Sequence, residues 1–154
     1  MKVLPEINPP DAECLGSNAF ALPHGIIGFA DYKRAELLYS SEHLPFLWMR
    51  LQGPAGTVNF VVIEPAGIVP GYELEIFDND AEALDLGDPT QAMVLNIVTL
   101  RPEAPLEATA NLIGPIVINR RTRVGRQLVI ANYSKYSARH ILVQNDVAPV
   151  LASA

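Results

Sequence analysis

Short apolar, β-prone runs recur along this chain, and turn-forming residues separate them. "GPAG" at 53–56 is the strongest of these turn signals, because glycine and proline both end regular strands. Strands at short intervals favour an all-β domain, and closing a small antiparallel sheet removes its exposed edges. We therefore expect a small antiparallel β-barrel, closed or nearly closed. The expected strands lie at 18–22, 35–41, 45–51, 57–64, 91–100, 108–114, 115–119 and 127–132.

The run "QAMVLNIVTL" at 91–100 is the longest of these strand candidates. Alternation places Met93, Leu95, Ile97 and Thr99 on one face and Val94, Asn96, Val98 and Leu100 on the other. Both faces are largely apolar, which predicts a central strand that is covered on both sides. The residues expected in the core are Trp48, Phe60, Leu95, Ile97, Ile116 and Ile118.

One segment, "NDAEALDLGD" at 79–88, carries a helix signal. Asn79 is a good N-cap residue, and Glu82 completes a capping box at the required spacing. Acidic residues fill the first turn, where the helix dipole favours them, and Gly87 is placed to end the helix. The pattern predicts one short helix near residues 79–86.

The 154 residues suffice for one domain with a substantial core. Hydrophobic residues make up 49% of the chain and charged residues 18%, which excludes general disorder. Prolines at positions 5, 9 and 10 predict a loose leader over 1–17, followed by one domain at 18–142 and a tail at 143–154.

Targeting signals are not readable in the sequence. No apolar run approaches the roughly 20 residues of a membrane helix, and the N-terminal residues do not resemble a signal peptide. A single cysteine, Cys14, allows no internal disulfide and no thiolate zinc site. A cytoplasmic protein with no membrane contact is the simplest expectation.

Catalytic and cofactor motifs are also lacking. The three histidines, His24, His43 and His140, are isolated from one another, and no nucleophile elbow is present. Metal-binding spacings, a phosphate-binding loop and a dinucleotide fingerprint are not found. We therefore expect no catalytic residues, no metal and no cofactor, and a protein that is not an enzyme.

Charge is unevenly distributed along the chain, whose net charge is −6. Residues 1–110 hold 5 Lys and Arg against 16 Asp and Glu, a balance of −11. Residues 111–154 hold 6 Lys and Arg against one acid, a balance of +5. Two interpretations stay open: a surface that faces a partner, or two solvated ends of a barrel.

The turn "RRTRVGR" at 120–126 concentrates arginines that we expect to project into solvent: Arg120, Arg121, Arg123 and Arg126. They favour, in this order, a solvated turn, a contact with an acidic protein partner, or nucleic-acid binding. The acidic remainder of the chain opposes a polyanion, and no aromatic residue interleaves the arginines to stack a base. A small β-barrel RNA-binding module is the alternative function.

The segment "ATANLIGPIVIN" at 108–119 carries two asparagines inside apolar runs. Buried amides need hydrogen-bond partners, so we expect Asn111 and Asn119 to bind backbone groups where strands break at Gly114-Pro115. The alternative is that this segment forms part of a partner surface.

Seven motifs occur in a fixed order over about residues 20–142: "LPHGIIGFADYKR", "NFVVIEP", "VPGYE", "MVLNIVT", "TANLIGPIVIN", "VGRQLVI" and "YSARH". This set resembles the FliW family of flagellar assembly factors. The resemblance implies a cytoplasmic binding protein that binds flagellin before export and also binds CsrA, a dimeric RNA-binding repressor of flagellin mRNA translation. Flagellin and CsrA would compete, so that flagellin export relieves repression.

The residues that we expect to contact a partner lie in these motifs and in the arginine turn. They are Tyr72, Asn111, Asn119, Arg121, Arg123, Arg126 and Arg139. The resemblance implies no cofactor and no direct contact with nucleic acid.

Overall fold

The computed structural model describes residues 1–5, 18–39, 41–103 and 106–145, with side chains described as far as residue 143. Its strands are β1 Lys2–Val3, β2 Ala19–Ala21, β3 Arg34–Leu38, β4 Phe46–Gly53, β5 Gly56–Ile63, β6 Leu74–Glu75, β7 Ala92–Arg101, β8 Leu106–Ala110, β9 Ile116–Asn119, β10 Gly125–Gln127 and β11 His140–Asn145. The helical elements are α1 Asp78–Ala83 and two 3-10 turns, η2 Pro89–Gln91 and η3 Tyr133–Lys135.

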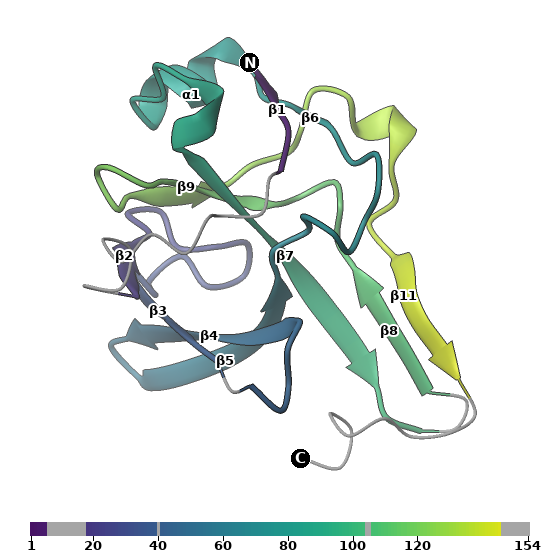
Figure 1. Ribbon diagram of the computed structural model, residues 1–154. Coiled ribbons are helices and arrows are strands. Elements are labelled where there is room, and N and C mark those ends of the chain that lie inside the picture. Colours follow the sequence, from purple (N-terminus) through teal and green to yellow (C-terminus); the bar gives the residue numbers. More distant parts are fainter. Residues whose placement is uncertain (6–17, 40, 104–105, 146–154) are drawn as a thin grey trace.

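Nine strands form one curled antiparallel sheet (Figure 1). Seven of them follow the order β10-β9-β7-β5-β4-β3-β2, and β8 and β11 branch from β7. The Ala21 N–H donates to the Arg123 carbonyl at 2.8 Å, which joins β2 to the hairpin between β9 and β10. This hydrogen bond brings the two ends of the curled sheet together, so that the half-barrel is nearly closed. The prediction of an all-β, nearly closed antiparallel barrel with one short helix is confirmed.

Strand β7 is central, as its apolar pattern predicts. One edge pairs with β5, and the other edge pairs with β9 over Ala92–Leu95 and with β8 over Val98–Arg101. Strand β9 continues into the barrel through β10, whereas β8 pairs with β11. The sheet therefore forks at 111–115, the segment that joins β8 to β9.

Both faces of β7 are covered, each by its own hydrophobic core. Met93 and Leu95 face the barrel interior with Ile116 and Ile118. Val94 and Val98 face a second core, which also contains residues from β6, α1 and β8 and Leu84, the residue that follows α1. The predicted assignment of side chains to the two faces is thus confirmed. Of the expected core residues, Leu95, Ile116 and Ile118 are fully buried, while Trp48, Phe60 and Ile97 are half-buried against the two cores.

The helix is present, but the predicted cap is wrong. Phe77 occupies the N-cap position without a side-chain hydrogen bond, and its carbonyl accepts from the N–H groups of Asp80 and Ala81. Asn79 lies inside the first turn, because the preceding strand β6 sets where the chain enters the helix. The reversal after the helix occurs at Asp85, with φ 53°, rather than at Gly87.

Two further differences concern the ends and the last predicted strand. The leader is not loose at its start, because β1 pairs with β6 and Val3 is 1% exposed; residues 6–17 lie outside the described residues. Strand β11 reaches Asn145, beyond the predicted domain end at 142. Within 127–132, only Gln127 is in a strand, because the N–H groups of Leu128 and Ile130 donate to carbonyls in the fork.

Candidate interaction surface

Asn119 ties the end of α1 to the arginine turn. This fully buried side chain ends β9, and its Nδ2 donates to the carbonyls of Leu84 at 2.8 Å and Asp85 at 3.1 Å. Its Oδ1 accepts from the N–H groups of Arg121 at 2.8 Å and Thr122 at 3.2 Å. The last carbonyls of a helix lack partners within it, so Asn119 satisfies groups on both elements. The predicted backbone role of this amide is confirmed.

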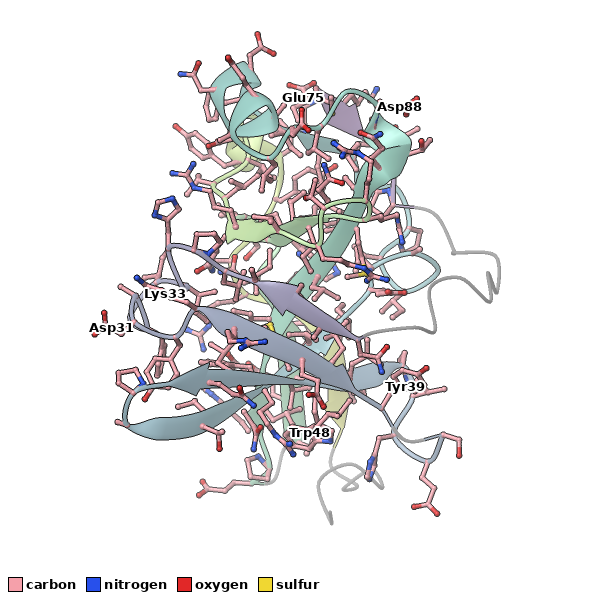
Figure 2. All side chains as sticks on the ribbon, turned by 90° about the vertical axis from the view of Figure 1, so that its left-hand side faces the viewer. Asp31, Lys33, Tyr39, Trp48, Glu75 and Asp88 are labelled. Atoms are coloured by element: carbon pink, nitrogen blue, oxygen red, sulfur yellow. The ribbon has the colours of Figure 1, made fainter. Side chains whose placement is uncertain are left out.

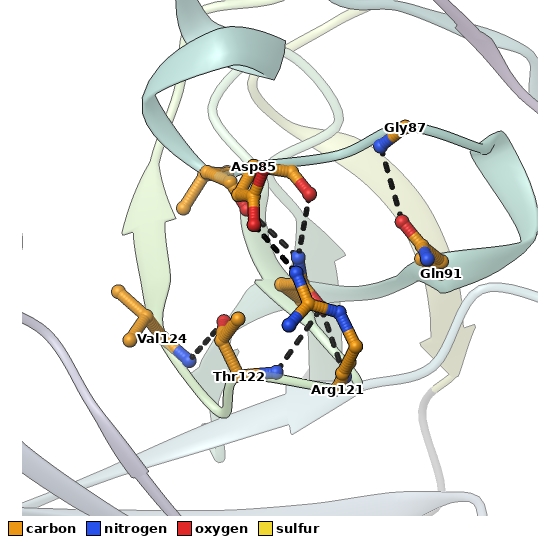
Figure 3. Close-up of polar contacts among 8 residues, drawn as sticks. Asp85, Gly87, Gln91, Arg121, Thr122 and Val124 are labelled. Atoms are coloured by element: carbon orange, nitrogen blue, oxygen red, sulfur yellow. Dashed lines mark hydrogen bonds and ion pairs between the residues drawn. The ribbon is translucent and has the colours of Figure 1, made fainter.

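The arginine turn lies against the acidic helix segment (Figure 3). Arg121 Nη2 donates to Asp85 Oδ2, and Arg126 Nη1 lies 3.8 Å from Asp80 Oδ1. Both partners of the first pair are largely exposed, so this ion pair adds little stability, typically about 0–1 kcal/mol. The main effect of these two contacts is electrostatic. Arg121 neutralises Asp85 and Arg126 neutralises Asp80, so neither arginine offers its full positive charge to a polyanion.

The expectation that all four arginines project into solvent is wrong for three of them. Arg121 is exposed, whereas Arg120, Arg123 and Arg126 are half-buried. Arg126 belongs to β10, which directs it toward Asp80. Arg123 has φ 59°, and its backbone supplies the carbonyl that holds β2. The turn is therefore a structural corner in which Arg121 is the most exposed of the four arginines.

Arg120 lies beside Glu64 at a small cavity. The cavity measures about 20 Å³, and its lining includes Pro5, Met93 and both of these charged residues. Burial raises the pKa of the Glu64 carboxyl, and the nearby Arg120 charge opposes this shift. A cavity of this size has room for about one water molecule, so it is too small for a cofactor.

A second polar network holds the fork of the sheet. The Tyr72 hydroxyl donates to the Leu112 carbonyl at 2.5 Å and accepts from Asn96 Nδ2 at 3.2 Å. Asn96 Nδ2 also donates to the Asn111 carbonyl at 2.9 Å. Asn111 Oδ1 accepts from the N–H groups of Ile113 and Gly114, at 3.1 and 2.9 Å, which confirms its predicted role at the strand break.

Burial at the fork also affects the chemistry of Tyr72. Desolvation raises the pKa of its hydroxyl above the usual range. The hydroxyl therefore stays protonated and keeps its donor role at all ordinary pH values.

The structure divides the expected partner-binding residues into three groups. Asn119, Arg121, Arg123 and Arg126 lie together beside α1, and Tyr72 and Asn111 lie together at the fork. Arg139 belongs to neither group; it is exposed, and its N–H donates to Ser137 Oγ. Tyr72 is only 4% exposed and Asn119 is fully buried, so neither side chain is available for direct contact in this conformation.

Sequence reasoning missed the partners of these residues. Asn96 is fully buried in the network, and the signal for it was a single amide on an otherwise apolar face of 91–100. Asp80 and Asp85 pair with the arginines, but the sequence shows them only as helix acids.

The end of the molecule that carries α1 is rich in carboxylates, and four of them lie beside cations: Glu73 beside Lys2, Asp78 beside the Met1 amino group, Asp80 beside Arg126 and Asp85 beside Arg121. Residues 51–100 contain eight acids and no Lys or Arg: Glu64, Glu73, Glu75, Asp78, Asp80, Glu82, Asp85 and Asp88. Glu75 and Asp88 both lie at this end, and Trp48 lies at the opposite end (Figure 2). Hydrogen bonds from Thr90 lower the pKa of the exposed Asp88 carboxyl, so its negative charge is secure at neutral pH.

The described part of the chain offers neither a metal site nor a membrane-spanning helix. No group of three or more His, Cys, Asp or Glu side chains there is arranged to hold a metal ion. None of its helices is long and apolar enough to cross a membrane.

Fold and surface together define a small half-barrel protein with one acidic end. A family model described as "FliW protein" matches residues 10–142. The chain is 36% identical to the flagellar assembly factor FliW of Natranaerobius thermophilus over 124 residues, covering 80% of this chain and 81% of that protein. It is 34% identical to the FliW of Moorella thermoacetica over 141 residues, covering 92% of this chain and 84% of the relative.

A solved structure agrees with these sequence comparisons. The crystal structure of a flagellar assembly factor FliW superposes with a TM-score of 0.68 at 32% identity, covering 84% of this chain and 89% of that one. The chain therefore belongs to the FliW family of flagellar assembly factors. The relatives are named for flagellar assembly, a role that is not enzymatic.

Proposed function

We propose that this flagellar assembly factor acts in the cytoplasm as a binding protein with two competing partners, flagellin and CsrA. Unexported flagellin occupies the factor. When flagellin is exported, the freed factor binds CsrA and relieves the repression of flagellin mRNA translation. The proposal follows from the family resemblance, and the acidic end around α1 is the observation on this chain that supports it best.

Electrostatics support a basic protein partner at this end. A protein that binds RNA carries Lys and Arg to neutralise phosphates, so its surface is attracted by a cluster of carboxylates. The same carboxylates repel RNA itself. The pairing of Arg121 with Asp85 and the approach of Arg126 to Asp80 reduce the positive charge that an RNA-binding module would need, and they neutralise two of the carboxylates as well.

The chain should bind CsrA with no RNA present, and added salt should slow the association. Salt weakens the attraction between an acidic and a basic surface that are more than about 8 Å apart at physiological ionic strength. This long-range attraction acts mainly on the association rate. We expect the association rate constant to fall about tenfold between low salt and about 0.5 M salt, as stopped-flow measurements would detect. A failure to form any complex with CsrA of the same organism, by calorimetry and by gel filtration, would remove the proposal.

A further inference from the structure

Strand β11 is the outer strand of the sheet on the far side of the fork (Figure 1). One of its edges pairs with β8, and among the described residues no strand pairs with the other edge. At the opposite end of the sheet β2 is held, because Ala21 forms a bridge with Val124 and its N–H donates to the Arg123 carbonyl. Strand β11 therefore presents an open row of backbone N–H and C=O groups.

The composition of β11 does little to prevent pairing with another strand. Natural edge strands are protected by charged side chains, by proline or by bulges. The six residues of β11 read HILVQN, with no Asp, Glu, Lys, Arg or Pro. One protective feature is present, a register irregularity between Ile141 and Val143. Ile141 itself is 53% exposed, so the edge carries an apolar side chain that a neighbouring strand would cover.

An extended backbone is the ligand that fits such an edge. Its N–H and C=O groups are spaced for another strand about 4.8 Å away, and main-chain hydrogen bonds then provide the affinity. Six residues extend for about 20 Å, so the contact is small. A strand added here continues the sheet beyond β11.

Charges at the two ends of β11 favour a second copy of this chain as the added strand. Lys135 and Arg139 are exposed and lie just before β11 begins. At its other end Glu107 is paired with the strand, and Glu103 lies in the turn between β7 and β8, together with Arg101. A two-fold axis places the start of each antiparallel strand opposite the end of the other. The two cations of each copy then approach the carboxylates of its partner.

We propose that two copies of this chain associate edge to edge through β11, as an antiparallel pair that joins their sheets. The two-fold axis lies near Leu142, so the irregularities of the two strands face each other and the stretches on either side pair. Because the contact is small, the dimer is weak, with a dissociation constant on the order of 100 μM.

Sedimentation equilibrium of the purified chain tests this proposal. The apparent mass should rise from one copy toward two between about 10 μM and about 1 mM. Ile141→Lys should raise the dissociation constant about tenfold or more, because a lysine on an edge strand opposes pairing.

Val129→Lys is the matched control for this variant. Val129 is also β-branched and is 52% exposed, but its neighbours Leu128 and Ile130 donate to carbonyls of the fork, away from the free edge of β11. The control should associate within about twofold of the unchanged chain. Arg139→Glu provides a second arm outside the strand, and it should also weaken association, since it removes a cation that faces the partner's carboxylates.

Amide hydrogen exchange locates the contact. Amides of β11 that point away from β8 should exchange at least about fivefold more slowly at the high concentration than at the low one, while amides of β9 should not change. Thermal unfolding verifies that each variant is folded.

Two results would overturn the dimer: a chain that stays monomeric at about 1 mM, or a dimer in which exchange along β11 is unchanged. Equal association of folded Ile141→Lys and Arg139→Glu with the unchanged chain would overturn it as well. If exchange at β11 slows only when flagellin or CsrA is added, the edge receives a strand from a partner protein, and the second copy is excluded as its occupant.

Discussion

Replacing Gly25 with alanine is expected to lower the free energy of unfolding by about 4 kcal/mol or more, enough to unfold a marginal domain. Gly25 has φ 62°, and an added Cβ would lie 2.0 Å from the Phe29 carbonyl oxygen and 2.7 Å from Ala30 Cα. These are backbone atoms, which cannot rotate away as a side chain can. Phe29 is also fixed, because its N–H donates to the Ile26 carbonyl at 2.8 Å.

Gly28→Ala is the matched control for this turn. Gly28 also has a positive φ, 87°, but an added Cβ would meet nothing within 4 Å. Only the strain of the left-handed backbone remains, which costs about 1 kcal/mol. Urea denaturation followed by circular dichroism should separate the two variants clearly. Equal losses would show that the contact with Phe29 relaxes at little cost.

Asn119→Ala is expected to cost about 3 kcal/mol of stability. The substitution removes four hydrogen bonds at a fully buried position, leaving two carbonyls after α1 and two N–H groups in the arginine turn without this partner. Backbone groups that lose a buried partner cost more than the net value of an ordinary hydrogen bond, because water replaces the partner poorly.

Asn132→Ala serves as the control for the asparagine variant. Asn132 also binds backbone groups, those of Glu73 and Glu75, but these bonds are exposed to water. We expect this variant to lose about 1 kcal/mol or less, as judged by the same urea denaturation. A loss below about 0.5 kcal/mol for Asn119→Ala would mean that the helix and the turn hold together without the amide.

Much of the fold could be predicted from the sequence where local pattern and tertiary packing agree. The run 91–100 alternates two apolar faces, and β7 buries one in the barrel and the other in the second core. The "GPAG" turn joins β4 to β5 in the expected hairpin, with Gly53 opposite Gly56. These features depend on neighbours in the sequence, which are visible without a structure.

Features set by distant segments could not be predicted in the same way. The capping box at Asn79 is a local pattern, but the position of the preceding strand β6 determines where the chain enters the helix, which starts at Asp78. The segment 127–132 has strand composition, yet its N–H groups bind carbonyls of the fork rather than a continuous neighbour.

For the surface beside α1, the sequence predicted which residues matter but not which of them pair. Buried amides must be satisfied, so roles for Asn111 and Asn119 followed from chemistry alone. Arg121 and Asp85 are 36 residues apart in the sequence, and only the fold brings them together. An arginine-rich turn therefore suggested a solvent-facing cluster, whereas three of its four arginines are half-buried residues.

Competition between flagellin and CsrA for this chain tests the proposed function most directly. The measurement is titration of flagellin into a preformed complex of this chain with fluorescently labelled CsrA, followed by anisotropy. Flagellin should release CsrA to completion, and unlabelled CsrA should do the same, while an unrelated secreted protein should release none. A stable complex of all three proteins, or flagellin that leaves the anisotropy unchanged at saturating concentration, would contradict the account.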